Sequence, residues 1–210
     1  MVLRPLERLE AKLRELLGER DVDGHGLTHA LRVRRLARDL ALKVGADVEV
    51  VEAAALLHDV ARALGIEGDH AERSASIALP LMIEAGISEE KAVKAAEIIR
   101  RHRYSSRRDV ASLEEAVLRD ADMLDAMGAI GVARAVAYGA LRGRSLYDLE
   151  DPFAQRRNPD DSKYTLDHFY VKLLRLKELM NTEEGRRRAE RRTRFLKLFL
   201  EELMLDLEGL

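Results

Sequence analysis

Apolar residues recur every three or four positions along most of the chain, and no segment alternates apolar with polar side chains. A three-to-four spacing is typical of amphipathic helices, whereas alternation would indicate strands. Pro80 is expected to kink the fourth helix or to split it in two. The pattern predicts an all-α fold of eight or nine helices, at about 4–17, 28–44, 47–63, 70–85, 88–103, 112–126, 128–142, 165–181 and 182–207.

Residues that favour helix ends support these boundaries. Thr28 and Asp47 are suited to cap the second and third helices, and Gly65 is suited to end the third. Ser112 and Glu115 have the spacing of a capping box at the start of the sixth helix. These helix-end residues agree with the helical pattern, so we expect a fold without a β-sheet.

The segment 143–163 interrupts the helical pattern. It carries two prolines and is long for a connection inside a compact domain. It is predicted to be either a lid over a pocket or a surface excursion without a role. We expect one domain over residues 1–210, with a core at about 20–142 and C-terminal helices at about 165–207 packed on it.

Polar residues interrupt the apolar faces at a few places. His58 and Asp59 stand inside the apolar run 53–61, His29 lies on the apolar face of the second helix, and Asp122 lies on the sixth. Burying an imidazole and a carboxylate is costly unless a partner compensates, and a divalent metal ion is such a partner. His58 and Asp59 would point roughly 100° apart on one helix, so the ion is expected beside that helix.

The order of these residues resembles the H…HD…D signature of the HD-domain metal-dependent phosphohydrolases. The resemblance spans roughly residues 20–205 and is closest to the subgroup represented by YpgQ and YedJ. It implies an all-helical enzyme that cuts phosphate esters or anhydrides, and in this subgroup a nucleoside triphosphate pyrophosphohydrolase. The segments that carry it are DGHGLTHALRV at 23–33, AALLHDVAR at 54–62, HAERSA at 70–75, IIRRH at 98–102, RDADMLDAMGAIGVAR at 119–134 and DHFYVKL at 167–173.

The resemblance implies that the metal ligands are His29, His58, Asp59 and Asp122. Two imidazoles and two carboxylates, in a chain without cysteine, suit Mn²⁺, Fe²⁺, Co²⁺, Ni²⁺ or Zn²⁺, and suit Mg²⁺ less well. Such an ion lowers the pKa of a bound water and neutralises charge on a phosphoryl group. The alternative without a metal is a set of buried hydrogen bonds between histidine and aspartate.

Three further histidines bear on the site. By the resemblance, His70 and His102 either serve catalysis beside a single ion or hold a second one; we prefer the single ion, because the subgroup resemblance is the closer one. The alternative for each is a solvated histidine at a helix end. His25 either orients a ligand or lies in solvent.

Two basic residues are candidates for binding phosphate. Arg62 stands three residues after Asp59, where several related nucleotidases have Glu or His. An arginine cannot act as a general base near neutral pH, so it is expected to clamp phosphate. The base is then His70, Asp125 or the metal hydroxide. The resemblance favours Lys172 as a second phosphate contact, against the alternative of a solvated lysine.

Two arginine-rich runs, 100–108 and 186–194, raise the alternative of nucleic-acid binding. The formal net charge of -2 and the aromatic content of 4% argue against nucleic acid as the main substrate. The first run brackets His102 and is expected to attract a polyphosphate by its local field.

The composition indicates a cytoplasmic enzyme. The start of the chain lacks the apolar core of a signal peptide, and no run reaches membrane-spanning length. The 35% of charged residues, with few amides, suggests a thermophilic source. The leading interpretation is a pyrophosphohydrolase with a small-molecule nucleotide substrate. The alternative function is that of a 5′-nucleotidase or a phosphodiesterase, and a third hypothesis is a non-catalytic, metal-stabilised protein. The sequence does not determine whether the protein forms a homo-oligomer.

Overall fold

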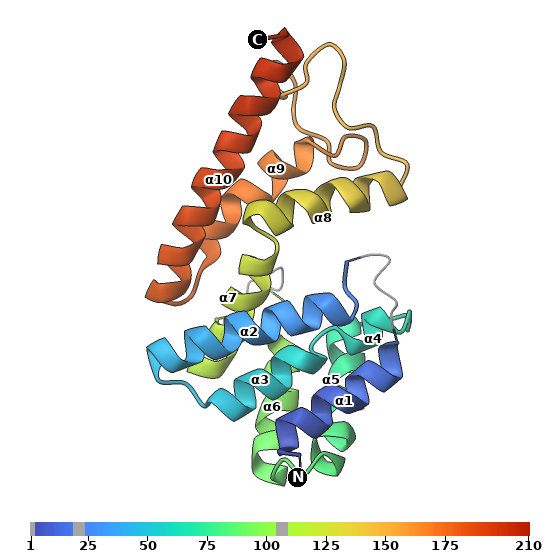
Figure 1. Ribbon diagram of the computed structural model, residues 1–210, viewed down its shortest axis with the longest axis vertical. Coiled ribbons are helices and arrows are strands. Elements are labelled where there is room, and N and C mark those ends of the chain that lie inside the picture. Colours follow the sequence, from blue (N-terminus) through green and yellow to red (C-terminus); the bar gives the residue numbers. More distant parts are fainter. Residues whose placement is uncertain (1–2, 19–23, 104–108) are drawn as a thin grey trace. The chain divides into compact units, whose positions relative to one another are not determined.

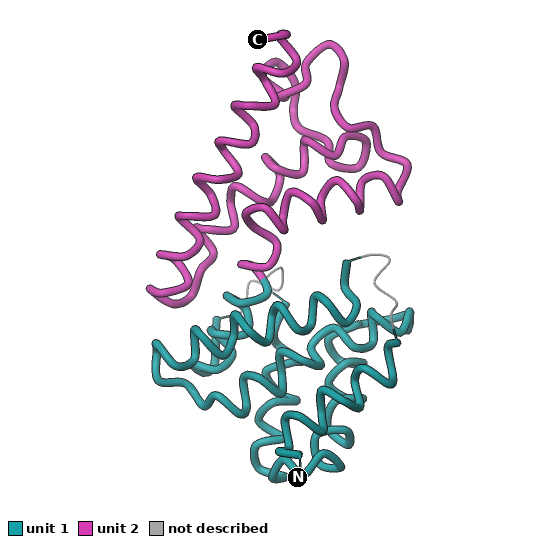
Figure 2. The backbone as a smooth tube through the Cα atoms, viewed as in Figure 1, with its two compact units in different colours: residues 1–122 teal, residues 123–210 magenta. Residues whose placement is uncertain are grey.

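The computed structural model describes residues 3–18, 24–103 and 109–210 (Figure 1). Over these residues the backbone forms helices joined by turns and loops, and its only β-type pairing is an isolated bridge between Ser145 and Tyr164. The predicted all-α fold class is therefore confirmed. The chain divides into two compact units, residues 1–122 and 123–210, which Figure 2 colours separately. The single domain expected from the sequence stays a prediction.

Unit 1 is built around a helix that is buried on every side. In this helix, α3 (Val48–Leu57), all residues from Val50 to Leu57 are buried; the charged residue among them, Glu52, pairs with Arg34 at 2.8 Å. Four further helices pack against α3 and bury their own apolar faces: α1 (Pro5–Leu17), α2 (Leu27–Val44), α5 (His70–Glu84) and α6 (Glu89–Arg101). The last helix to enter the unit is α7 (Leu113–Asp125), which continues past the boundary at residue 122.

Two of the predicted helix caps are present. The Asp47 carboxylate accepts hydrogen bonds from the backbone N–H groups of Glu49 and Val50, at 3.0 and 3.2 Å. The Ser112 hydroxyl accepts one from the backbone N–H of Glu115 at 3.1 Å. These bonds satisfy donors that the first turn of each helix leaves without a partner.

The prediction that Thr28 caps the second helix is wrong. Helix α2 begins at Leu27 with Gly26 at its N-cap, so Thr28 lies inside the first turn, where its hydroxyl accepts a hydrogen bond from Arg32 at 3.1 Å. Pro80 does not split its helix, because α5 continues through it to Glu84.

The predicted third helix, 47–63, is broken at His58 and Asp59. Helix α3 ends at Leu57, and the short helix α4 (Val60–Ala63) starts after Asp59, whose φ of -114° and ψ of 17° are not helical. The prediction of one helix is wrong because buried apolar residues continue through the break, so the pattern gives no sign of it. Asp59 is the N-cap residue of α4, yet its side chain makes no capping hydrogen bond and is available to other partners.

Unit 2 packs two helices and a 3₁₀ segment together. Helix α10 (Glu183–Glu208) lies against α8 (Gly128–Leu141) and the 3₁₀ helix η2 (Leu173–Leu179), which follows the short helix α9 (Asp167–Val171). Phe169 stacks on Phe199 in its core, with 5.6 Å between ring centroids. The single helix predicted at 165–181 is wrong, because the backbone leaves the helical region at Lys172.

The loop 143–163 is closed at its base. The Ser145 N–H donates to the Lys163 carbonyl at 3.1 Å, and the Thr165 N–H donates to the Ser145 carbonyl at 2.9 Å. Gly139 on α8 lets this base approach closely, since a Cβ there would collide with the Thr165 side chain. The ends of the loop are thereby fixed beside α8.

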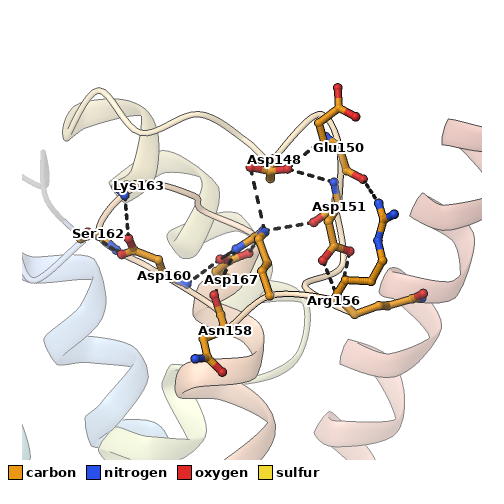
Figure 3. Close-up of polar contacts among 11 residues, drawn as sticks. Asp148, Glu150, Asp151, Arg156, Asn158, Asp160, Ser162, Lys163 and Asp167 are labelled. Atoms are coloured by element: carbon orange, nitrogen blue, oxygen red, sulfur yellow. Dashed lines mark hydrogen bonds and ion pairs between the residues drawn. The ribbon is translucent and has the colours of Figure 1, made fainter.

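Inside the loop, carboxylates hold the backbone (Figure 3). Asp148 and Asp151 each accept hydrogen bonds from backbone N–H groups of the loop, at 2.7 to 3.0 Å. Asp167 is fully buried; it accepts from the guanidinium of Arg157 at 2.9 Å and from the Asp160 N–H at 2.6 Å. Leu149 projects outward with 87% of its surface exposed. The loop is thus self-supporting, and its role as a lid stays a prediction.

Replacing Asp167 with asparagine should loosen this loop. The variant leaves the Arg157 guanidinium beside a buried group that no longer carries a compensating charge. We expect amide hydrogen exchange across 143–163 to speed up by about 30-fold or more. The control is Glu178→Gln, which removes an exposed ion pair with Lys177 and should change exchange by less than about fivefold. Equal effects of the two variants would contradict the assignment of Asp167 as the anchor of the loop.

No single described helix is long and apolar enough to cross a membrane; α7 and α8 reach that threshold only when counted together across the bend between them.

Candidate metal centre

Four side chains predicted as metal ligands come together in unit 1. His29 comes from α2, His58 and Asp59 from the turn between α3 and α4, and Asp122 from α7. The Nε2 atoms of His29 and His58 are 3.2 Å apart. The Asp122 Oδ1 atom lies 3.6 and 3.8 Å from them, and the Asp59 Oδ2 atom lies 4.0 and 3.8 Å from them. The four donor atoms therefore converge on one small region.

A second set of donors shares Asp59. The Nε2 atoms of His70 and His102 each lie 3.7 Å from Asp59 Oδ1, the oxygen that does not face His29 and His58. His70 is the first residue of α5, and His102 caps the C-terminus of α6. Each set of three, with His29 and His58 or with His70 and His102, is close enough to hold a metal ion. Asp59 thus stands between two histidine pairs.

Backbone carbonyls fix the orientation of two of these rings. His58 Nδ1 lies 2.9 Å from the Ala55 carbonyl, and His102 Nδ1 lies 2.6 Å from the Ile99 carbonyl. A carbonyl only accepts, so each Nδ1 carries a proton and each Nε2 is directed at the carboxylates. A metal-binding histidine commonly uses its other nitrogen in this way.

The donor set fits a cation. The Asp59 Oδ1 atom is buried and has no hydrogen-bond partner in the described part of the chain. Leaving a buried carboxylate oxygen unsatisfied is costly, and a positive charge on the side of His70 and His102, which this oxygen faces, removes that cost. Imidazole nitrogens with carboxylate oxygens are typical ligands of divalent transition metals.

The charges in the site are strongly coupled. Burial opposes a charge on His58, but the Asp59 and Asp122 carboxylates outweigh it and raise the pKa of His58 to about 9. Burial would raise the pKa of Asp59, yet His58 and His102 hold it well below its usual value. Burial lowers the pKa of His70 more strongly than Asp59 raises it, so this imidazole is neutral at neutral pH and can accept a proton.

Metal binding to the metal-free protein should release a proton. Below pH 9, His58 carries a proton on Nε2 that an ion must displace, so the apparent affinity should rise as the pH rises and level off above the His58 pKa of about 9. We expect roughly a tenfold gain per pH unit for one displaced proton. Titration calorimetry in two buffers of different ionisation enthalpy measures the release. An affinity that does not change between neutral pH and the His58 pKa would contradict it.

A buried network that sequence reasoning missed supports the end of α6. Glu115 is fully buried and forms ion pairs with Arg101 at 2.9 Å and with Arg119 at 2.6 Å. Arg119 also donates to the Arg101 carbonyl at 2.7 Å. Arg101 precedes His102, so the network fixes the backbone from which this histidine projects. The four-residue spacing of Glu115 and Arg119 was the available signal.

The other predicted site residues are placed as follows. Arg62 is exposed on α4 and has no ion pair with any described residue, and its charge helps to lower the pKa of His70. His25 lies beside His29, with ring centroids 5.5 Å apart. Asp125 is buried and paired with Arg134 at 2.8 Å, and its predicted role as the base stays a prediction. Lys172 belongs to unit 2, and its predicted phosphate contact stays a prediction.

The described arginines of the first run lie beside carboxylates. Arg100 pairs with Glu72 and Glu97, Arg101 with Glu115, and Arg103 lies 3.8 Å from Asp69. This balance weakens the expectation that the run attracts a polyphosphate. Two of its members, Arg107 and Arg108, lie outside the described residues, as does Asp23 of the first motif.

Comparisons with known proteins agree on the HD domain. The HD domain family matches residues 26–127, the range that holds both donor sets. YpgQ of Bacillus subtilis, named as an uncharacterized protein, is 32% identical over 213 residues, covering 99% of this chain and 96% of that protein. Its crystal structure in complex with ADP matches with a TM-score of 0.76 and covers 96% of this chain and 94% of that one. The crystal structure of an HD-superfamily hydrolase from Bacillus thuringiensis matches with a TM-score of 0.77 at 33% identity, covering 98% of this chain and 97% of that one.

Proposed function

Because the chain belongs to the HD-domain family of metal-dependent phosphohydrolases, we propose that it hydrolyses nucleotides with one divalent transition-metal ion bound in unit 1. The proposed ligands are His29, His58, Asp59 and Asp122. The observation that carries this proposal is the convergence of these donor atoms: the two imidazole Nε2 atoms are 3.2 Å apart, and the Asp59 and Asp122 oxygens lie 3.6 to 4.0 Å from them. When bound, the ion lowers the pKa of water and neutralises charge on the phosphoryl group.

We propose that His70 and Arg62 act on the reactants. His70 is neutral at neutral pH, so its Nε2 can take the proton of the water that attacks phosphorus. Arg62 is exposed and has no carboxylate partner among the described residues, so its guanidinium is available to phosphate oxygens. His102, held by the Ile99 carbonyl, directs its Nε2 at Asp59 from the same side as His70, at 3.7 Å.

We propose a nucleoside or deoxynucleoside triphosphate as the substrate, with pyrophosphate as the leaving group. Water attacks the α-phosphorus, the bond to the bridging oxygen breaks, and the products are a monophosphate and pyrophosphate. The subgroup resemblance supports this choice, and the crystal structure of the relative YpgQ with ADP supports a nucleotide ligand. A 5′-nucleotidase or phosphodiesterase activity at the same site is the alternative, because a single ion also serves those reactions.

Product analysis tests the proposal. The full chain, loaded with Mn²⁺, Co²⁺ or Ni²⁺ and separately with Mg²⁺, is incubated with a panel of nucleoside tri-, di- and monophosphates. Ion chromatography then measures pyrophosphate and orthophosphate separately. Monophosphate plus pyrophosphate, formed faster with a transition metal than with Mg²⁺, is the expected result. Nucleoside plus orthophosphate would move the activity to a 5′-nucleotidase.

Arg62→Gln should weaken substrate binding more than turnover. If Arg62 holds phosphate equally in the ground and transition states, its loss raises KM by about tenfold and leaves kcat nearly unchanged. The metal content should not change. Arg38→Gln, an exposed arginine on α2, is the control and should leave both constants as they are. A fall in kcat with KM unchanged would assign Arg62 to the transition state instead.

A further inference from the structure

Four arginines of α10 line a hollow in unit 2. They are Arg187, Arg188, Arg191 and Arg192, and the hollow measures about 250 Å³. Their spacing of i, i+1, i+4 and i+5 places all four on one side of the helix, within an arc of roughly 140°. None of them belongs to the metal centre. We call this feature the arginine hollow.

Carboxylates balance only part of this charge. Arg187 and Arg188 both pair with Glu184, each at 2.8 Å. Arg191 and Arg192 have no ion pair within the described part of the chain. Like charges gathered on one face repel one another, and an anion relieves that repulsion.

One of the unpaired guanidinium groups is fixed in place. Arg192 donates to the Leu124 carbonyl, and its stem passes Gly128, where an added Cβ would lie 3.3 Å from Arg192 Cγ. Burial lowers the pKa of Arg192; the Asp125 carboxylate opposes this effect, and Arg191 and Arg188 lower the pKa further. A solvated surface arginine would be free to move away from such neighbours. Arg192 is instead held beside them, which is the arrangement of a preformed anion site.

We propose that the arginine hollow binds a compact polyphosphate anion, such as pyrophosphate or triphosphate. Guanidinium groups suit phosphate oxygens because they donate two parallel hydrogen bonds. The volume of the arginine hollow is below the roughly 300–1,000 Å³ of pockets that enclose a drug-sized ligand, so the hollow suits a chain of phosphate groups rather than a whole nucleotide. From Arg187 to Arg192 the helix rises only about 7.5 Å, which is short for tracking a nucleic-acid backbone.

The proposal is independent of the activity proposed for unit 1, and it can be tested without turnover. Titration calorimetry at low ionic strength measures the binding of inorganic triphosphate to the full chain in the presence of a chelator. We expect binding that Arg191→Gln weakens by about tenfold or more, because one charge-assisted contact is lost. Arg194→Gln, an exposed arginine on the same helix that does not line the hollow, is the control and should change Kd by less than about twofold.

Three results would overturn the proposal. The first is no binding of triphosphate to the chelated protein. The second is equal weakening by Arg191→Gln and Arg194→Gln, which would show that a diffuse field and not the hollow attracts the anion. The third is single-stranded RNA without a terminal phosphate binding more tightly than triphosphate, with the same dependence on Arg191. That result would assign the surface to nucleic acid.

Discussion

Asp59→Asn is expected to abolish both metal retention and turnover. Among the described residues, Asp59 is the one carboxylate that faces both histidine pairs, and the substitution removes its charge while keeping its shape. Neutral amide oxygen is a much weaker partner for a divalent ion beside two imidazoles, so bound metal should fall below about a tenth of an equivalent. Elemental analysis after reconstitution with Mn²⁺ and a nucleotide hydrolysis assay measure the two effects.

The control for this experiment is Asp206→Asn. Asp206 is an exposed carboxylate on α10, and its loss should leave metal content and activity unchanged. Circular dichroism of Asp59→Asn should still report a helical protein, because the residue lies in a turn and makes no capping bond. Retention of one equivalent of metal with normal turnover would show that Asp59 is not a ligand of the ion.

His70→Ala should keep the metal and lose turnover. The neutral imidazole is proposed to move a proton, a role that contributes about 10²–10⁴-fold, so the loss should appear in kcat rather than KM. The pH profile of kcat should lose its acidic limb in the variant, since the group that must be neutral is gone. Steady-state kinetics across pH, with metal analysis of the same sample, measures both.

His168→Ala is the matched control for His70→Ala. His168 is a partly buried histidine of unit 2 that bonds Asp161 at 2.8 Å, and its loss should leave kcat unchanged. If His70→Ala loses a second equivalent of metal, then His70, His102 and Asp59 hold an ion and the single-ion assignment is wrong. If kcat does not change, His70 is not the base.

The sequence drew attention to His58 and Asp59 because both conflict with their apolar surroundings; the role of these residues, with His29 and Asp122, as metal ligands stays a prediction. An imidazole and a carboxylate in the run 53–61 need a partner, and that need is visible without coordinates. The break at Asp59 was not visible, since Val60 and Ala61 continue the apolar pattern on its far side. The orientation of each ring was also hidden, because it depends on single backbone carbonyls such as that of Ala55.

Contacts between residues far apart in the sequence, and the boundary between the units, could not be predicted for a related reason. The bond from Arg119 to the Arg101 carbonyl joins residues 18 apart, and nothing in local spacing predicts it. The unit boundary between Asp122 and Met123 falls inside α7, where the helical pattern is continuous. The spacing of the arginines in α10 likewise does not show which of them pair with Glu184 and which have no ion pair with a described residue.

The closed base of the loop 143–163 makes its tip a convenient attachment point for a probe. Leu149 is exposed, so a group can be attached there. The backbone hydrogen bonds of Ser145 at the base of the loop and the bond from Asp160 to Asp167 hold the rest of the loop, so the attached group should not disturb α8 or α9. The chain has no cysteine, so Leu149→Cys creates a single thiol that a fluorophore or spin label modifies at one position. A reporter placed there responds to changes in unit 2 when nucleotide is added, while the proposed metal ligands keep their native side chains.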